Sequence, residues 1–305
     1  MGKLAEKFNL KNKASLEKRG KRITLICTLL MLLIVVTIIA MVTVKGMSTF
    51  VVNKVSIGEF LFKSDWQPTS VDQNGRPLVG ALPMILGSFA VTFLSILFST
   101  PFAIGAAIYM VEISPEIGKK YLQPIIELLV GIPSVVYGMI GLTVVVPIVR
   151  DIFGGTGFGI LSGTIVLTIM VLPTITSLSI DAIASVDNSQ REASLGLGAT
   201  RWQTIYKVVI RAALPGVLTA IVLGMARAFG EALAVQMVIG NTSIIPESLT
   251  TPASTLTSIL TMSMGNTIPG QLENNVLWTL ALILMLMSLF FIALIHMIGR
   301  EKKDD

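Results

Sequence analysis

Long apolar runs, separated by shorter polar segments, are the dominant pattern along this chain. A membrane-spanning helix needs about 20 mainly apolar residues, and six segments reach that length. They lie near residues 23–44, 82–111, 123–149, 158–180, 208–239 and 276–298. Several contain helix breakers, such as Pro101, Pro133, Pro173 and Pro215. Membranes tolerate such breaks where protein or a cavity covers the freed backbone groups. The pattern therefore predicts an all-α integral membrane protein with six transmembrane helices.

Composition excludes the soluble alternatives. Hydrophobic residues make up 53% of the 305-residue chain, charged residues make up 13%, and the mean hydropathy is +0.80. A soluble domain carries about 25% charged residues, so a soluble enzyme and a disordered chain are both excluded. The single cysteine, Cys27, permits no intrachain disulfide. The single histidine, His296, argues against a histidine-rich metal site. We expect no cofactor or metal bound to this chain.

The placement of basic residues predicts the orientation of the spans. If the amino terminus is cytoplasmic, seventeen of the 23 Lys and Arg residues fall in inner segments, five fall in outer segments, and Arg227 lies within a span. This asymmetry follows the positive-inside rule, so we expect both termini in the cytoplasm. It also explains the net charge of +5 without a nucleic-acid partner. The first apolar run is too long for a cleaved signal peptide, and we interpret it as a retained anchor in membrane lipid.

This orientation divides the chain into five parts. They are a basic cytoplasmic tail 1–22, a first transmembrane helix 23–44, an external loop 45–81, a core 82–299 with the other five helices and a cytoplasmic loop 181–207, and a cytoplasmic tail 300–305. In the last outer loop, apolar residues recur at helical spacing, so part of it is predicted to fold back toward the membrane as a helix. These residues are Leu256, Ile259, Leu260, Met262 and Met264.

The chain contains no nucleotide-binding P-loop. That motif reads Gly-x4-Gly-Lys-Ser/Thr, because backbone amides and a lysine must surround the phosphates. The nearest candidate, Gly118-Lys119-Lys120, lacks both the second glycine at the right spacing and the hydroxyl. The chain is therefore not itself an ATPase of that class. A channel, a secondary carrier and the membrane part of a pump driven by another subunit remain possible.

The cytoplasmic loop 181–207 separates these possibilities. It predicts a short helix, a break at Gly-Ala-Thr and a second short helix. Small residues let such a helix dock closely in a partner's groove, and Arg191 with Glu192 would set its register. The loop resembles the EAA loop of ABC-importer permeases, in which Glu-Ala-Ala is followed after three residues by Gly. Glu192, Ala193, Ser194 and Gly198 occupy those places. An ordinary amphipathic loop helix is the alternative.

Further segments resemble phosphate-specific importer permeases. They are 101–112, 131–138 and 227–241, and the last resembles the PstC type more than its partner PstA. The resemblance covers about residues 80–299. It departs from the family pattern at Asp187, where a proline is expected, and at Val208-Val209-Ile210-Arg211, which replaces Ile-x-Leu-Pro.

The resemblance implies a permease bundle in the bacterial plasma (inner) membrane that imports inorganic phosphate. The implied partners are a PstA-like second permease, PstB-like ATPase subunits that use the ATP, and an extracytoplasmic PstS-like phosphate-binding protein. Contact with the ATPase is assigned to Arg191, Glu192, Ala193, Ser194, Gly198, Ala199 and Thr200. An ABC permease for another oxyanion, such as sulfate or molybdate, stays open. So does an ATP-independent carrier or channel, which the coupling-type loop disfavours.

Arg227 and Glu231 are the candidate substrate-path residues. They are four residues apart, so we expect them on one helix face. A charge at the bilayer centre costs at least about 2.5–3.5 kcal/mol, so such residues usually face a partner or a watery path. Arginine offers a planar fork that suits phosphate oxygens, and a mutual ion pair is the alternative. Small residues at every fourth position predict close helix packing, which we interpret as a seam with a second permease. They are Gly216, Ala220, Gly224, Ala228 and Ala232.

Overall fold

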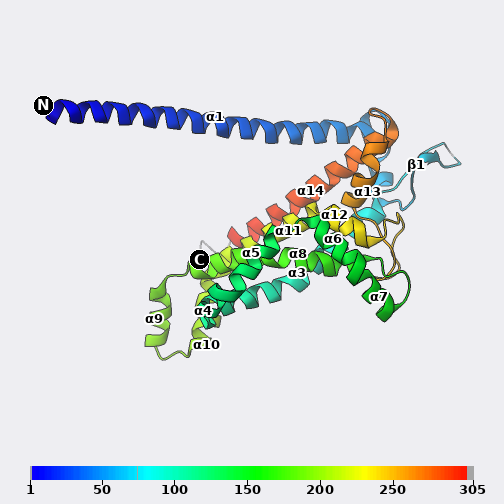
Figure 1. Ribbon diagram of the computed structural model, residues 1–305. Helices are drawn as coiled ribbons and strands as arrows, with labels where there is room; N and C mark the ends of the chain where they lie inside the picture. Colours follow the sequence, from blue (N-terminus) through cyan, green and yellow to red (C-terminus); the bar gives the residue numbers. More distant parts are fainter. Residues whose placement is uncertain (1, 74, 301–305) are drawn as a thin grey trace.

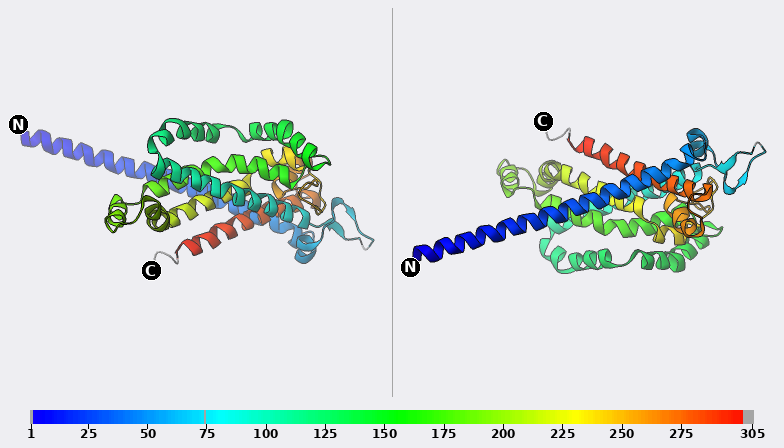
Figure 2. Two further views of the ribbon diagram at one scale, coloured as in Figure 1. Left: turned by 90° about the horizontal axis from the view of Figure 1, so that it is seen from below. Right: turned by 90° about the horizontal axis from the view of Figure 1, so that it is seen from above.

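The computed structural model describes residues 2–73 and 75–300, with side chains from residue 17 to 293 in those ranges. The fold is a helical bundle from which one helix, α1, projects alone (Figures 1 and 2). Six helical segments of the described chain are long and apolar enough to cross a membrane, which confirms the six-span prediction. They are Glu17–Val51, Leu82–Ile113, Ser134–Phe153, Ile160–Ala184, Arg201–Gly230 and Leu272–Ala293.

The elements follow one another in this order: α1 (Gly2–Val51), α2 (Ile57–Phe62), β1 (Trp66–Val71), β2 (Pro77–Val79), α3 (Leu82–Ile108), η1 (Tyr109–Ile113), α4 (Pro115–Ile117), η2 (Gly118–Leu122), α5 (Gln123–Gly131), α6 (Ser134–Ile140), η3 (Gly141–Val145), α7 (Val146–Phe153), α8 (Ile160–Ala184), α9 (Asn188–Gly196), α10 (Arg201–Thr204), η4 (Ile205–Val209), α11 (Ile210–Gly230), α12 (Leu233–Ile239), α13 (Leu256–Ser263), η5 (Met264–Asn266) and α14 (Leu272–Arg300). Of the predicted tail 300–305, Arg300 ends α14 and residues 301–305 lie outside the described residues.

The first span is longer than its apolar run predicts. α1 continues through the basic tail without a break and extends past residue 44 to Val51. Its last two turns pack on α14, where the buried hydroxyl of Thr279 donates to the carbonyl of Gly46 and pairs with Thr49, each at 2.7 Å. These contacts, which hydropathy cannot reveal, keep residues 45–51 helical.

The third predicted span, 123–149, is divided at Pro133. α5 ends at Gly131, and Ile132 and Pro133 are extended before α6 begins. Proline has no N–H to continue the helical ladder. The hydroxyl of Tyr137 donates to the carbonyl of Leu129 across the break at 2.8 Å, so protein satisfies one of the backbone groups that the break releases.

The core of the bundle is built from α3, α8 and α11. A Cβ on Gly224 would lie 2.5 Å from Cγ1 of Ile175 in α8. A Cβ on Gly216 would lie 2.7 Å from Cβ of Ala182, also in α8. The small residues of α11 therefore face α8 of the same chain. Our interpretation of them as a seam with a second permease was wrong, because four-residue spacing indicates close approach without identifying the neighbouring helix.

Four π-helical turns of five residues each lie between helices of the described chain. In η1 the backbone N–H of Ser114 donates to the carbonyl of Tyr109, five residues earlier. The same pattern occurs in η2, η3 and η4. η1 continues α3, η2 precedes α5, and η4 joins α10 to α11. Such turns are rare and frequently lie at functional sites.

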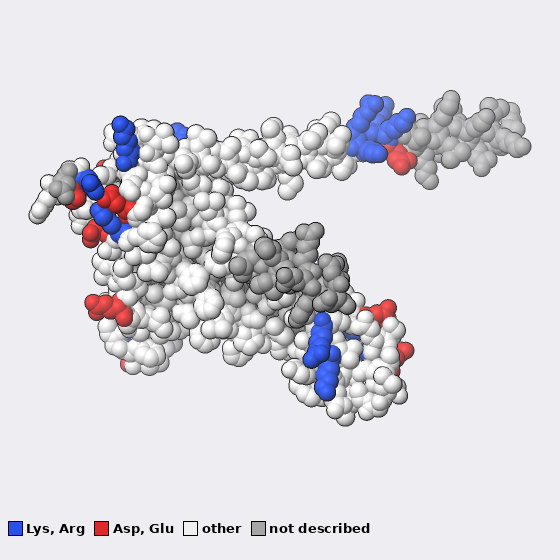
Figure 3. Space-filling model, turned by 180° about the vertical axis from the view of Figure 1, so that it is seen from behind, with Lys and Arg blue, Asp and Glu red and all other residues white. Residues whose placement is uncertain are grey.

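The segment between α1 and α3 is held partly by hydrogen bonds between charged side chains. β1 and β2 form an antiparallel hairpin in which Trp66 pairs with Val79. Glu59 of α2 accepts hydrogen bonds from Lys63 at 3.2 Å and from Arg76, next to β2, at 2.8 Å. These bonds hold the pKa of Glu59 below its usual value. Figure 3 shows a broad uncharged surface between this charged end and the opposite one, as expected of a band in contact with lipid.

Candidate functional site

The loop 181–207 forms a helical hairpin, α9 and α10, that stands out from one end of the bundle (Figure 1). Asp187 begins it: its carboxylate accepts the backbone N–H of Ser189 at 2.8 Å. That hydrogen bond lowers the pKa of Asp187. At the position where the family pattern has proline, this chain therefore starts the helix with a side-chain cap.

The turn between α9 and α10 depends on Gly198. Its φ of +81° is a left-handed conformation, and no atom lies within 4 Å of the Cβ that another residue would add. Its N–H donates to the carbonyl of Leu195, and the N–H of Ala199 donates to that of Ser194. These two bonds define a Schellman motif, which favours glycine at this position. Within this chain the glycine therefore serves the turn geometry and relieves no close contact.

The remaining predicted coupling residues lie on the same hairpin. Thr200 caps α10 through a capping box with Gln203, and the hydroxyls of Ser194 and Thr204 are 2.9 Å apart, joining its two legs. Glu192 and Ala193 are exposed. The apolar Leu197, 91% exposed at the tip, was absent from our candidates. A leucine directly before the Gly-Ala-Thr break is the sequence signal that would have found it.

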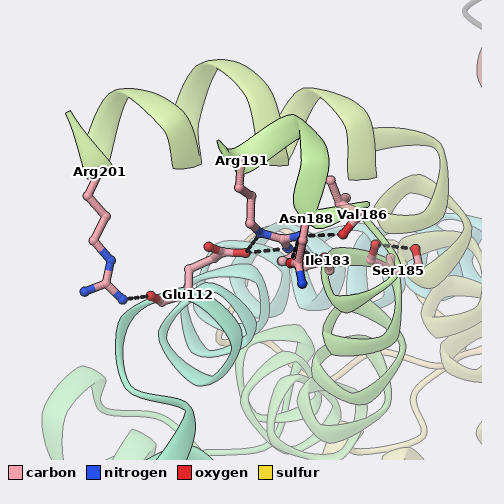
Figure 4. A network of polar contacts seen from close by, with 8 residues as sticks. Glu112, Ile183, Ser185, Val186, Asn188, Arg191 and Arg201 are labelled. Carbon is pink, nitrogen blue, oxygen red and sulfur yellow. Dashed lines mark hydrogen bonds and ion pairs between the residues drawn. The ribbon is translucent and has the colours of Figure 1, made fainter. Parts of the chain in front are cut away.

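Arg191, which was expected with Glu192 to set the register of docking on a partner, forms its contacts with the bundle. Its guanidinium turns back to the bundle and forms an ion pair with Glu112 of η1, with Nη2 and Oε1 2.7 Å apart (Figure 4). It also donates to the carbonyls of Ile183 and Val186, at the end of α8. Glu112 was missed because it precedes Arg191 by 79 positions, and no local pattern links the two.

Arg227 and Glu231 do not share a helix face. α11 ends at Gly230, and Glu231 has an extended backbone (φ −72°, ψ 123°) before α12 begins. Arg227 donates to the hydroxyl of Thr174 in α8. Glu231 Oε1 accepts the N–H of Ala234 at 3.0 Å and so caps α12. Among the residues whose side chains are described, these two form no ion pair. The expectation of one shared face was wrong, because the helix breaks between them.

Glu231 faces a small cavity between α3, α8 and the start of α13. Four hydroxyl side chains surround it with Glu231: Ser88, Thr92, Thr255 and Thr257. The cavity has about 10 Å³ of free space, close to what one water molecule needs. In this conformation the cavity is too small for a phosphate ion. The structure thus places Glu231 among neutral donors and acceptors, and Arg227 outside that group.

Six spans, a broken fifth span and a helical hairpin that stands out from the bundle define the class, which is a membrane permease subunit. The chain matches the family described as binding-protein-dependent transport system inner membrane component over residues 99–304, and it belongs to that family. It is a multi-pass protein of the bacterial inner membrane, and in this family a separate subunit hydrolyses the ATP.

Individual relatives agree with the family match. The chain is 56% identical to the probable ABC transporter permease protein YqgH of Bacillus subtilis over 288 residues, covering 94% of this chain and 92% of the relative. It is 32% identical to the phosphate transport system permease protein PstC of Pasteurella multocida, covering 80% of this chain and 81% of that one. Its fold is similar to a chain of a bacterial alginate ABC transporter, with a TM-score of 0.61, 16% identity and coverage of 93% and 96%.

Proposed function

We propose that this chain is the phosphate-conducting permease subunit of an ATP-driven importer. The observation that carries the proposal is the similarity to proteins described as phosphate transport system permease PstC, at 32% identity over most of both chains. The site chemistry supports it. Arg227 lies half-buried within a predicted span, and among the described side chains Thr174 is its hydrogen-bond partner. A guanidinium carries five N–H donors, so several of them remain for an oxyanion.

The proposed partners follow the same similarity. A PstA-like permease would complete the translocation path, PstB-like ATPase subunits would dock on the α9–α10 hairpin, and a PstS-like protein would deliver phosphate to the outer loops. The exposed tip of the hairpin, with Leu197 and Trp202, supports the docking role, because apolar side chains on a polar loop favour a protein neighbour. ATP binding would move the hairpin, and the spans would alternate between outward-open and inward-open states around Arg227.

Uptake into proteoliposomes tests the substrate. The reconstituted complex, with ATP inside and the binding protein outside, should accumulate radiolabelled phosphate, and excess sulfate or molybdate should leave that uptake unchanged. Uptake of sulfate or molybdate in place of phosphate would assign the chain to another oxyanion. Phosphate uptake without any ATPase subunit would instead show an ATP-independent carrier.

A further inference from the structure

Two arginines of the hairpin bind the end of the same membrane helix. Arg191 belongs to α9 and Arg201 to α10, and both reach η1, the last turn of the second span (Figure 4). Nε and Nη2 of Arg191 lie 3.0 and 2.7 Å from Oε1 of Glu112. Arg201 donates to the backbone carbonyls of Glu112 and Ile113. Both helices of the hairpin, α9 and α10, are therefore hydrogen-bonded to the single turn η1.

The chemistry of that turn explains why it attracts two cations. η1 ends at Ile113. The next residue, Ser114, leaves the helical region with a φ of −143°, and Pro115 follows. The last carbonyls of a helix lack partners within it and carry the negative end of its dipole. Glu112 adds a full negative charge there. Its side chain is 11% exposed and that of Arg191 is 17% exposed, so little water competes with or screens this pair.

The same helix reaches the cavity beside Glu231. η1 continues α3 directly, and α3 contributes Ser88, Val91 and Thr92 to the cavity lining. With a rise of about 1.5 Å per residue, about 36 Å separates Ser88 from Glu112 along the helix. At the far end, Ser88 accepts the N–H of Leu256 at 2.8 Å. One helix thus connects the cytoplasmic hairpin with the cavity beside Glu231.

We propose that Glu112 is a positioning residue that fixes the α9–α10 hairpin to α3. Displacement of the hairpin by the partner ATPase is thereby transmitted along α3 to the cavity that Glu231 lines. The inference rests on the proposed coupling role of the hairpin. Glu112 itself binds neither nucleotide nor phosphate. Without its charge, α9 keeps its bonds to the end of α8 and loses its strong attachment to α3, so the hairpin moves without moving α3.

The first test measures coupling in the complete reconstituted complex. Glu112→Gln should leave the ATPase subunits bound and hydrolysing ATP, while phosphate transported per ATP falls at least about fivefold, the lower end of common coupling effects. Glu112→Asp keeps the charge and should recover part of the ratio. Glu116→Gln, an exposed carboxylate in α4, is the matched control and should match wild type. A merely structural role would lower the yield of complex and leave the ratio unchanged.

An unchanged ratio in Glu112→Gln would overturn the proposal. So would loss of the ATPase subunits from that variant, because the residue would then shape the docking surface instead of transmitting its motion.

The second test needs no transported substrate. Spin labels at Gln190→Cys in α9 and Phe102→Cys in α3, both exposed positions, are placed in a Cys27→Ser background of the whole complex. The distance distribution should be narrow and equal with and without ATP and vanadate, and Glu112→Gln should broaden it. A distance that changes with nucleotide in the otherwise wild-type complex contradicts rigid attachment. If the complex takes up no phosphate yet shows the equal narrow distances, the substrate proposal fails and the positioning role stands.

Discussion

At the scale of single residues, Arg227 and Glu231 show that two charges close in sequence need not act as a pair. The helix break at Glu231 directs its carboxylate to the N-terminus of α12, and Arg227 turns to α8. Each charge is thus stabilised by neutral groups. A guanidinium without a carboxylate partner is better suited to hold an incoming anion than one already neutralised.

The first prediction concerns Arg227. Arg227→Ala should abolish phosphate uptake while the complex still assembles. Arg227→Lys should also be impaired, because lysine keeps the charge and loses the planar fork. Arg211→Lys, at an exposed position on the same helix, is the control. Uptake of radiolabelled phosphate, normalised to assembled complex, gives the result; normal transport by the lysine variant would mean that a point charge suffices.

Glu231 should determine selectivity between oxyanions. Near neutral pH, phosphate still carries a proton that an ionised carboxylate can accept, whereas sulfate offers none and is repelled. In Glu231→Gln the amide oxygen can still cap α12, and the amide nitrogen becomes a donor. We therefore expect lower phosphate uptake and stronger inhibition by sulfate.

This experiment requires either a binding protein that tolerates sulfate or an assay from which the binding protein is omitted. Glu247→Gln, at an exposed position between α12 and α13, provides the control. If sulfate is still excluded in the Glu231→Gln variant, Glu231 does not determine selectivity and its role is limited to capping α12.

At the scale of elements, the hairpin shows which parts of a structure the sequence reveals. The α9 helix, its break and its second short helix were predictable, because the Schellman glycine and the Thr-x-x-Gln capping box are local signals. The attachment of Arg191 to Glu112 was not, because it joins residues 79 positions apart. The break before Glu231 was also missed, since no proline marks it and Gly230 alone is tolerated inside helices.

The prediction at the scale of elements concerns Gly198 and the turn that it forms. Gly198→Val places a β-branched residue at φ +81°, which costs about 1–2 kcal/mol and should distort the turn between α9 and α10. We expect loss of ATPase binding or uncoupled hydrolysis, measured by co-purification and by uptake per ATP. Gly196→Ala is the matched control, because Gly196 ends α9 without a positive φ and with open space around it. Wild-type uptake by Gly198→Val would remove the hairpin geometry from the coupling mechanism.

At the scale of the whole molecule, hydropathy was sufficient to predict the number of membrane spans. It did not predict which spans pack against each other. The regular small residues of α11 predicted close packing correctly, yet the partner proved to be α8. Sequence periodicity identifies a face of a helix, and only the three-dimensional arrangement shows what covers it. The orientation of the termini, which rests on the positive-inside rule, stays a prediction.

Packing of α11 on α8 should contribute measurably to the stability of the bundle. In Gly224→Val the new side chain meets Ile175 and Val171, and overpacking of this kind costs about 1–3 kcal/mol. The melting temperature in detergent should therefore fall by several degrees. Gly105→Ala, at an open position of α3, should leave it unchanged or raise it slightly. Equal melting temperatures for Gly224→Val and wild type would show that the two helices separate freely at this point.

The π-helical turn η4 gives α11 one residue of extra length beside the hairpin. A π turn holds one residue more than the α-helical turn that would replace it. When η4 changes from one form to the other, α11 advances by about 1.5 Å and rotates by about 100° without losing its hydrogen-bonded continuity. Because η4 joins the hairpin to α11, a small push there can become a screw motion of that membrane helix while its backbone stays fully paired.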